Sequence, residues 1–401
     1  MKRSQQRPET KAVRGGTDLS KKNGPLSIPI FQTSTFEVTD NDQQLRAKPT
    51  DMFYTRYGNP THTVAERAIA ELEGVERALL FASGMNAITT SILALLKSGD
   101  HVVAQRDIYG GAAKFFGQWL PKLGIETAFV DTTDYDQHER AIRPNTRLLY
   151  VESPTNPLVR VVDLRKIVAI ARRHNLMTMI DSTFATPINC RPADFGIDLV
   201  MHSGTKYFGG HSDLIAGAVA GRAELIEKIH ATRTTLGGCM DPHAAWLLLR
   251  GIKTVAVRVQ RQNENALRVA QFLSEHPNVR HVHYPFLDGH PQRALAMEQM
   301  RGGGGGIVSF EVEGSGEDAR KLSESLNLFT LAPSLGGVDS LVCIPVLTSH
   351  AMVPAEHREK MGITEQLIRL SVGIEHADDL IADLEQALAG VGSSRHHAHV
   401  G

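Results

Sequence analysis

The sequence lacks an excess of charge of either sign. Its 401 residues include 43 Lys and Arg and 44 Asp and Glu, which gives a formal net charge of −1. Strongly basic or acidic proteins attract nucleic acids and membrane surfaces through their long-range fields, and this chain has no such field. The charge balance therefore argues against both partners and favours a small molecule as the ligand.

Long apolar runs and cysteine clusters are missing as well. The longest apolar stretch, around residues 88–96, is far shorter than a membrane span, and the basic residues 1–16 precede no apolar segment. The three cysteines, Cys190, Cys239 and Cys343, show no CxxC spacing, which argues against a disulfide framework or a zinc site. We therefore expect a soluble, cytoplasmic protein without a bound metal.

The chain is long enough for two or three domains. Residues 1–50 are polar and aperiodic, so we interpret them as an extended arm. We expect a large domain at residues 51–236 and a smaller one at residues 237–390, which contains a long helical pattern at 244–272. The polar tail, residues 391–401, is expected to be flexible.

Strand and helix patterns alternate through the large domain. Continuous apolar strands separated by helices imply a mainly parallel sheet with helices on both faces. In such sheets, ligands bind beyond the carboxyl ends of the strands. The strand patterns lie at residues 101–104, 126–130, 148–151, 177–180 and 199–201, and the helical patterns at 112–123 and 164–174.

The stretch 201–213, Met-His-Ser-Gly-Thr-Lys-Tyr-Phe-Gly-Gly-His-Ser-Asp, contains the first candidate catalytic residue. Lys206 follows the apolar run 197–201, which has the pattern of a buried strand, so its side chain should be partly desolvated. Burial disfavours the ammonium form and makes the amine a nucleophile toward aldehydes. We therefore hypothesise that Lys206 carries a covalently bound aldehyde cofactor. The alternative is a lysine that only caps the end of a strand.

Polar side chains also follow the ends of other strands. Tyr109 and Asn156 each come a few residues after a strand pattern, and Asp181 directly follows another. Polar groups at successive strand ends are difficult to explain as packing, so they are candidate site residues. A buried Asp181 needs a cationic partner or strong hydrogen bonds, and a protonated ring nitrogen would supply both. The alternative is a turn cap at Ser182 and Thr183.

Three further features favour the binding of anions. Ser83-Gly84-Met85 lies between an apolar strand and a helix start, where free N–H groups and the helix dipole attract phosphate, although Ser-Gly also serves as a plain connection between a strand and a helix. Tyr54 and Arg56 would form a phosphate clamp, although an ordinary turn with an aromatic anchor fits the same residues. Arg369 lies within the apolar strand pattern 367–373 and needs an anion, either a substrate carboxylate or the partner in an internal salt bridge.

Together these motifs resemble the Cys/Met-metabolism family of pyridoxal-phosphate (PLP) enzymes. This family includes cystathionine γ-synthase, cystathionine γ-lyase, methionine γ-lyase and the homoserine-ester sulfhydrylases. The resemblance covers about residues 25–390. The motifs that carry it follow in chain order: Tyr54-Thr55-Arg56-Tyr57-Gly58-Asn59-Pro60-Thr61, Ser83-Gly84-Met85, Asp107-Ile108-Tyr109-Gly110-Gly111, Glu152-Ser153-Pro154-Thr155-Asn156-Pro157, Asp181-Ser182-Thr183, Ser203-Gly204-Thr205-Lys206, Ser334-Leu335-Gly336-Gly337 and Arg369-Leu370-Ser371-Val372-Gly373.

The resemblance implies a fold-type I, aspartate-aminotransferase-like α/β enzyme with a PLP-binding large domain and a smaller α+β C-terminal domain. It further implies a homotetramer built from two dimers, in which Tyr54 and Arg56 of one subunit reach the active site of its neighbour. Lys206 would bind PLP and act as general base, Asp181 would pair with the ring nitrogen, and Tyr109 would stack on the ring and protonate the leaving group. The other implied contacts are Asn156 with the ring oxygen, Gly84, Met85, Ser203 and Thr205 with the phosphate, Thr183 with the cofactor pocket, and Arg369 and Ser334 with the substrate carboxylate.

The implied reaction is γ-elimination or γ-replacement on a homoserine- or cysteine-derived amino acid, of the cystathionine γ-synthase or γ-lyase type. The alternatives are an O-acyl-homoserine sulfhydrylase, a methionine γ-lyase, or a relative that adds a carbon nucleophile to the same unsaturated intermediate. A regulator that binds the cofactor without catalysis would not need Lys206, Tyr109 and Arg369 together.

Four positions are expected to decide which substrate is used. Gly111 stands where methionine γ-lyases typically have a cysteine, and Phe53 stands where many cystathionine γ-lyases have a glutamate. Asp339 replaces a glutamate that is common in the cystathionine enzymes and keeps its charge one methylene shorter. Lys114, shortly after the Tyr109 motif, is the fourth.

Overall fold

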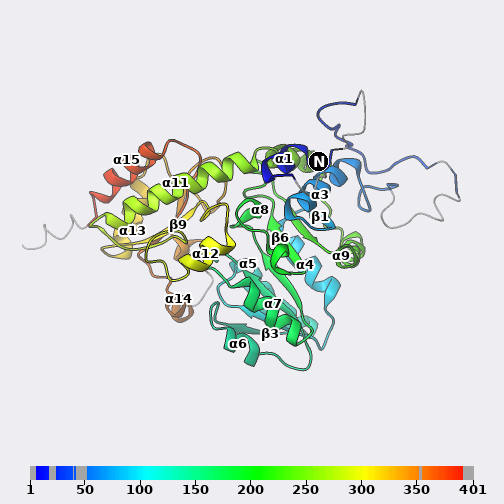
Figure 1. Cartoon of the computed structure of the whole chain (residues 1–401), viewed down its shortest axis with the longest axis horizontal. Helices are drawn as coiled ribbons and strands as arrows, with labels where there is room; N and C mark the ends of the chain where they lie inside the picture. Colours follow the sequence, from blue (N-terminus) through cyan, green and yellow to red (C-terminus); the bar gives the residue numbers. More distant parts are fainter. Residues whose placement is uncertain (1–5, 18–23, 39, 42–51, 352–354, 392–401) are drawn as a thin grey trace, which may run out of the picture. The chain divides into compact units, whose positions relative to one another are not determined.

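The computed structural model describes residues 6–17, 24–38, 40–41, 52–351 and 355–391, and Figure 1 draws their elements. The chain divides into two compact units, each with its own sheet. The first consists of Met1–Arg106, Lys114–Val151 and Leu164–Ala256, and the second of Asp107–Ala113, Glu152–Asp163 and Val257–Gly401. The domain bounds expected from the sequence stay predictions.

The two ends of the chain are only partly described. Within the expected arm 1–50, the described residues include helix α1 (Pro8–Arg14), in which Lys11 and Ala12 are buried. Residues 1–5, 18–23, 39 and 42–50 of the arm and residues 392–401 of the expected tail lie outside the described residues.

The first unit is built on a seven-stranded sheet of order β1-β7-β6-β5-β4-β2-β3. Strand β2 pairs in parallel with β3 and β4, and β5 pairs in parallel with β6. Only β7 is antiparallel to its neighbours, β1 and β6, among the described pairs of this sheet. The strands are β1 (Arg77–Phe81), β2 (His101–Gln105), β3 (Glu126–Val130), β4 (Thr146–Glu152), β5 (Met177–Asp181), β6 (Leu199–Ser203) and β7 (Gly217–Gly221). The prediction of a mainly parallel sheet is confirmed.

Helices lie between and around these strands, and the helix predicted at 164–174 is among them. They are α3 (Pro60–Glu73), α4 (Gly84–Leu95), α5 (Gly110–Lys114), α6 (Tyr135–Arg140), α7 (Leu164–Arg173), α8 (Thr186–Asn189), α9 (Ala223–Leu236) and α10 (Pro242–Ile252), with a short 3₁₀ helix at Pro192–Phe195. The prediction of one helix at 112–123 is wrong in part, because the chain passes from α5 into a π-helix at Phe115–Trp119 and a 3₁₀ helix at Leu120–Leu123. Pro121 has no N–H to continue an α-helix there.

The second unit contains a five-stranded sheet of order β10-β11-β12-β9-β8 and five helices among its described residues. Its strands are β8 (Val279–His283), β9 (Ile307–Val312), β10 (Thr330–Leu331), β11 (Leu341–Cys343) and β12 (Leu367–Ser371), and a 3₁₀ turn lies at Pro345–Leu347. Its helices are α11 (Val255–Glu275), α12 (Arg293–Gln299), α13 (Gly316–Ser325), α14 (Ala355–Met361) and α15 (Ala377–Leu388). The expected smaller α+β part is therefore present.

The helical pattern at 244–272 proves to be two helices, α10 and α11. The break falls where Thr254 turns back, since both its N–H and its hydroxyl donate to the carbonyl oxygen of Gly251. Gly251 itself is a poor helix former, so the first helix ends nearby. The periodicity of the apolar residues continues across this break and therefore did not predict it.

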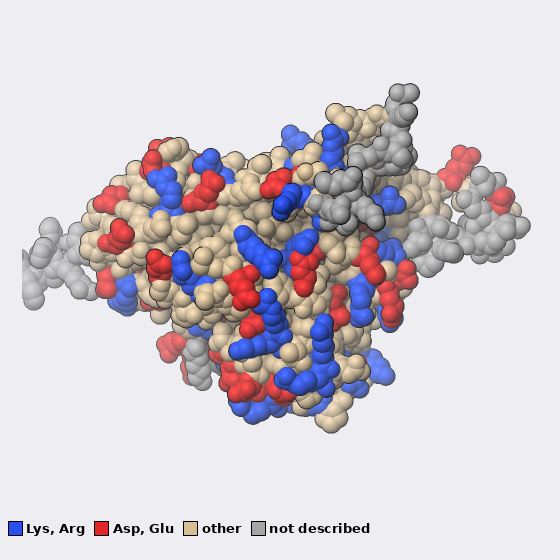
Figure 2. Space-filling model, in the orientation of Figure 1, with Lys and Arg blue, Asp and Glu red and all other residues tan. Residues whose placement is uncertain are grey.

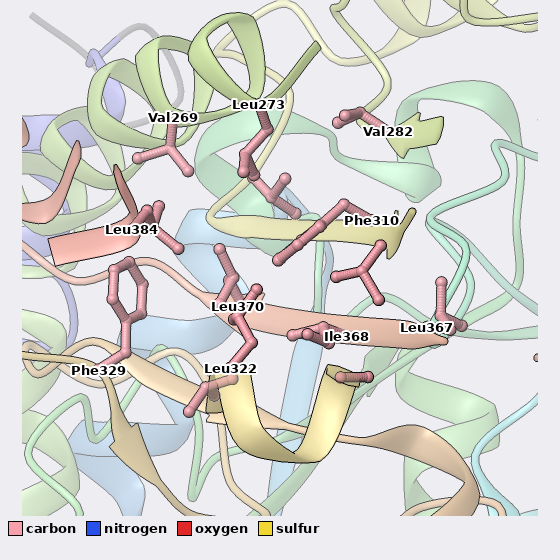
Figure 3. Packing of buried hydrophobic residues seen from close by; sticks show 14 of the residues in the cluster. Val269, Leu273, Val282, Phe310, Leu322, Phe329, Leu367, Ile368, Leu370 and Leu384 are labelled. Atoms are coloured by element: carbon pink, nitrogen blue, oxygen red, sulfur yellow. The ribbon is translucent and has the colours of Figure 1, made fainter. Parts of the chain in front are cut away.

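An apolar core joins the helices of the second unit to its sheet. Figure 3 shows Phe310 of β9 and Leu370 of β12 packed with Val269 and Leu273 of α11. These side chains are fully buried, and each contributes roughly 1.5–3 kcal/mol through removal of apolar surface from water. The core therefore fixes β12, the strand that carries Arg369.

Charged side chains of both signs are interspersed on the face of the molecule drawn in Figure 2, as expected for a net charge of −1. No helix within the described part of the chain is long and apolar enough to cross a membrane. The described residues also contain no group of three or more His, Cys, Asp or Glu side chains that could hold a metal.

Candidate active site

The turn from β1 to α4 presents the N-terminus of a 12-residue helix. Ser83 caps this helix by accepting a hydrogen bond from the Asn86 N–H at 3.1 Å. A Cβ atom on Gly84 would lie 3.1 Å from both the Cβ and the Oγ of Ser203. The missing side chain thus leaves an open cradle between the helix N-terminus and the Ser203 hydroxyl, which suits a phosphate group.

Strand β7 explains how this turn fits against the sheet. A Cβ atom on Gly217 would lie 2.1 Å from the carbonyl oxygen of Ser83, so only glycine allows this close approach. The strand sequence Gly-Ala-Val-Ala-Gly is therefore small for a packing reason. Strand β7 was not among the predicted strands, because glycine and alanine are depleted in strands.

Asp181 ends β5 beside the same region. It is buried, and its Oδ1 accepts hydrogen bonds from the N–H and the hydroxyl of Thr183 at 3.0 and 2.6 Å. The Thr183 hydroxyl in turn accepts a hydrogen bond from the Ser203 N–H at 2.9 Å. The turn cap considered from the sequence is therefore present, but it uses one carboxylate oxygen.

Burial raises the pKa of Asp181 above the ordinary value of a carboxyl group. The hydrogen bonds from Thr183 and the imidazole of His202 act in the opposite direction and lower this pKa. A cation at the second carboxylate oxygen would stabilise the charged form further. A protonated ring nitrogen fits this requirement.

Lys206 lies in a turn shortly after β6 and is half-buried, in line with the expected partial desolvation. Its N–H donates to the Ser203 carbonyl at 3.1 Å, and its own carbonyl accepts from the Gly210 N–H at 2.7 Å. The hydroxyl of the neighbouring Thr205 accepts a hydrogen bond from the Ala216 N–H at 2.9 Å. The first unit thus brings Asp181, Thr183, Ser203, Thr205, Lys206, Gly84 and Met85 to the carboxyl ends of β5 and β6 and to the start of α4.

Tyr54 and Arg56 lie together on a loop of the first unit. The guanidinium carbon of Arg56 is 5.3 Å from the ring centroids of both Tyr54 and Tyr57, while Phe53 packs on Tyr57 with a centroid distance of 4.7 Å. Tyr54 is 39% exposed. The two clamp residues therefore share one side of the loop, and the aromatic anchor is also present.

Arg369 is the most deeply buried of the expected substrate contacts, with 2% of its surface exposed. Its Nη1 donates to the side-chain oxygen of Asn156 at 3.0 Å, and its Nη2 donates to the Ser334 carbonyl at 3.1 Å. Its Nε is buried without a hydrogen-bond partner, and no described carboxylate forms an ion pair with it. A buried guanidinium held by neutral oxygens can receive an external anion.

Tyr109 follows β2 and has an exposed side chain, while its N–H donates to a carboxylate oxygen of Glu152 at 2.7 Å. The other oxygen of Glu152 accepts from the Asn156 N–H at 3.1 Å, so one carboxylate positions both segments. Arg160, which the motif reading did not single out, adds a 2.9 Å ion pair to Asp107. The second unit thus brings Tyr109, Asn156, Ser334 and Arg369 into one network of hydrogen bonds.

The loop 334–340 of this unit is held from several sides. The Gly336 N–H donates to the Ser371 hydroxyl at 2.8 Å, and the Ser340 N–H and hydroxyl donate to the Glu375 carboxylate at 2.6 and 2.9 Å. Asp339 is exposed on this loop. In the first unit, Lys114 is exposed at the end of α5.

An α/β fold with a lysine, a buried aspartate and an anion cradle at neighbouring strand and helix ends defines the class of fold-type I PLP enzymes. The family model for the Cys/Met metabolism PLP-dependent enzymes matches residues 9–389, and the chain belongs to this family. Its cofactor is pyridoxal 5′-phosphate, and the Gly84 cradle, Asp181 and Lys206 fit the phosphate, ring nitrogen and aldehyde of that group. The predicted family and fold are confirmed.

Several individual proteins of known name are similar to this chain along nearly its whole length. Cystathionine gamma-lyase of Bacillus subtilis (strain 168) is 43% identical over 384 residues, which are 96% of this chain and 99% of that protein. Cystathionine beta-lyase of Lactococcus lactis subsp. cremoris (strain MG1363) is 41% identical over 95% of this chain and 98% of its own length. The crystal structure of cystathionine gamma-lyase from Lactobacillus plantarum complexed with L-serine matches with a TM-score of 0.90 and 39% sequence identity. The match covers 96% of this chain and 99% of that one.

Proposed function

We propose that this enzyme is a lyase that cleaves a carbon–sulfur bond of cystathionine by γ-elimination. The observation that carries the proposal is Arg369, a buried guanidinium held by Asn156 and Ser334 through neutral oxygens. Such a group needs an anion, and the α-carboxylate of an amino acid supplies one bidentately. The relatives at 43% and 41% identity, both cystathionine lyases, favour this substrate over homoserine esters.

The residues of the first unit would hold the cofactor. Ser203, Thr205 and the N–H groups of Gly84 and Met85 would bind its phosphate, since they combine hydroxyl donors with a helix N-terminus. Asp181 and Thr183 would hold the ring nitrogen, and Lys206 would bind the aldehyde carbon. When bound, PLP withdraws electrons from the α-carbon of the amino acid.

Proton transfers would be made by two side chains. Once the incoming amino acid has displaced it, Lys206 Nζ would take the α-proton as general base. A β-proton would be removed next so that the γ-sulfur can leave, and Tyr109 would deliver a proton to that sulfur from its phenol oxygen. Asn156 would bond the ring oxygen of the cofactor while it positions Arg369. Phe53, Lys114 and Asp339 would contact the distal part of the substrate.

We also propose a homotetramer in which each active site receives Tyr54 and Arg56 from a neighbouring chain. Exposed apolar side chains on the first unit support a large interface, because such side chains are normally covered by a partner. They are Leu26, Phe31, Met52, Ile215 and Leu236, with exposures of 85%, 41%, 41%, 67% and 54%. The three free cysteines fit a reducing, cytoplasmic location.

A substrate panel tests the reaction type. PLP-loaded protein is incubated with cystathionine and with O-succinyl-, O-acetyl- and O-phosphohomoserine, each with and without cysteine or sulfide. We expect 2-oxobutyrate and ammonia whatever thiol is added. Cystathionine or homocysteine formed from the esters would instead establish the replacement reaction of a synthase or sulfhydrylase.

Loading with the cofactor is checked separately. An absorbance band at about 420 nm should appear when PLP is added to the wild-type protein and should be absent from Lys206→Ala. A full-chain protein that shows no such band would contradict the assignment of Lys206 whatever the substrate panel gives.

A further inference from the structure

Glu73 and His202 form a buried acid–base pair that none of the roles above explains. Glu73 Oε1 lies 2.5 Å from His202 Nε2, and the two side chains are 0% and 3% exposed. Glu73 is the last residue of α3, and His202 lies next to Ser203 in β6. The second oxygen of Glu73 is buried without a hydrogen-bond partner among the described residues.

Stability alone gives no reason for this pair. A carboxylate is unfavourable at the C-terminus of a helix, where the dipole is negative, and its burial removes hydration as well. Well-packed apolar side chains of similar volume often replace a buried ion pair without loss of stability. The pair therefore points to a role in the neighbouring site.

The backbone on either side of His202 binds the segment that carries Asp181. The Met201 carbonyl accepts a hydrogen bond from the Ser182 N–H at 3.0 Å, and the Ser203 N–H donates to the Thr183 hydroxyl at 2.9 Å. That hydroxyl donates to Asp181 Oδ1 at 2.6 Å. Anchoring the His202 side chain to α3 thus anchors the strand that orients the Asp181 carboxylate.

His202 also acts on Asp181 by charge. Asp181 pairs with Met201 in the parallel register of β5 and β6, and side chains alternate along a strand, so His202 lies on the opposite face of the sheet. Across this strand its imidazole lowers the pKa of Asp181 against the effect of burial. The other charged or titratable groups of this cluster are Glu73, the Cys190 thiol on which Glu73 acts, and Arg191 and Asp194, which also act on that thiol.

We propose that Glu73 and His202 are positioning residues for the cofactor, which hold β6 in place and keep the imidazole behind Asp181, so that the Asp181 carboxylate is oriented toward the ring nitrogen. The pair acts through Asp181 and is not catalytic. This inference rests on the proposed contact between Asp181 and the ring nitrogen of PLP. It assigns a role to a histidine and a glutamate 129 residues apart in the sequence.

The test compares His202→Gln and Glu73→Gln with the apolar double variant Glu73→Leu/His202→Phe in the full chain. PLP affinity is measured by titration of the apo-protein between pH 6 and 9, together with kcat, KM and the melting temperature. We expect His202→Gln to bind PLP about tenfold more weakly near pH 6, because the Asp181 carboxylate is then held less firmly and loses the imidazole that lowers its pKa. The pH below which affinity falls should move upward, because Asp181 takes up its proton at a higher pH.

The double variant separates the proposed role from packing. It restores a filled interior without a charge, so it should melt near the wild-type temperature and still show the upward pH shift. His138→Gln, which replaces a buried histidine of α6, is the matched control. It should leave the pH dependence of PLP affinity unchanged. Wild-type affinity and pH dependence in a folded double variant would overturn the inference.

Asp181→Asn distinguishes this inference from the function on which it rests. If Asp181→Asn loses PLP affinity while the double variant keeps it, the role of the pair is wrong and the Asp181 contact stands. If Asp181→Asn keeps wild-type affinity and absorbance, the Asp181 contact fails and the inference fails with it.

Discussion

Arg369 is the residue on which the proposed binding of the substrate carboxylate depends most directly. Its two Nη groups are fixed by Asn156 and by the Ser334 carbonyl, so the guanidinium plane is set before a substrate arrives. A preorganised fork of this kind loses little conformational entropy when it binds a carboxylate.

We expect Arg369→Lys to raise KM for cystathionine by about 10²-fold and to change kcat less, because an ammonium cannot make the bidentate contact. Steady-state kinetics measure both constants. Arg280→Lys, an exposed arginine of the same unit, is the control and should leave both unchanged. Equal losses in kcat and kcat/KM with no change in KM would contradict a role in binding.

Two buried histidines, His62 and His350, couple stability to pH. Burial lowers the pKa of each from an ordinary 6.5 to about 4. Below pH 6.5 the unfolded chain binds protons that the folded protein excludes, so stability is complete above that pH and is lost as pH falls toward 4, by about 1.4 kcal/mol per pH unit for each group.

The urea concentration at the midpoint of unfolding should therefore be lower at pH 5.5 than at pH 7.5. The difference between the two pH values should be smaller in His350→Gln. Urea unfolding at the two pH values measures the difference. His376→Gln removes an exposed histidine and should leave the difference unchanged. A wild-type pH dependence in His350→Gln would show that this histidine is protonated in the folded state.

At the scale of elements, the proposed phosphate site depends on helix α4 and the cradle at Gly84. Gly84→Ala should weaken PLP affinity at least about tenfold while the helix persists, because alanine favours helices but its Cβ would come 3.1 Å from Ser203. Titration of the apo-protein measures the affinity. Gly24→Ala, where a Cβ meets open space, is the control. Unchanged affinity in Gly84→Ala would remove the phosphate from this cradle.

Much of the element order could be predicted from the sequence, since continuous apolar strands such as 199–201 and the periodic helix 377–388 follow simple rules. The prediction of secondary structure failed where contacts with residues distant in the sequence, or a single proline, decide the local conformation. Strand β7 is built of small residues because Ser83 lies against it, and the expected helix at 112–123 changes type before Pro121. Neither cause is visible in a local pattern.

The candidate site shows the same division. Lys206, Asp181 and Arg369 could be singled out because a charged side chain beside an apolar strand is unusual. Glu73 and His202 could not, because their contact joins residues far apart in the sequence and His202 alone resembles an ordinary core histidine. Contacts of this kind become visible only when α3 and β6 are placed together.

At the scale of the whole molecule, the proposed tetramer makes a prediction of its own. Lys206→Ala and Arg56→Ala should each be inactive as pure proteins. When unfolded and refolded together, they should regain about a quarter of wild-type activity, since half of the dimers are mixed and each has one intact site. No recovery from well-folded mixed oligomers would show that Arg56 serves its own chain.

The central claim is that this chain cleaves cystathionine with PLP, and one measurement tests it most directly. PLP-loaded protein is incubated with L-cystathionine, and cysteine, homocysteine, 2-oxobutyrate, pyruvate and ammonia are quantified together. We predict cysteine, 2-oxobutyrate and ammonia in equal amounts, with none formed by Lys206→Ala. Homocysteine and pyruvate as the main products would establish β-elimination instead, and no cleavage by fully loaded protein would contradict the account.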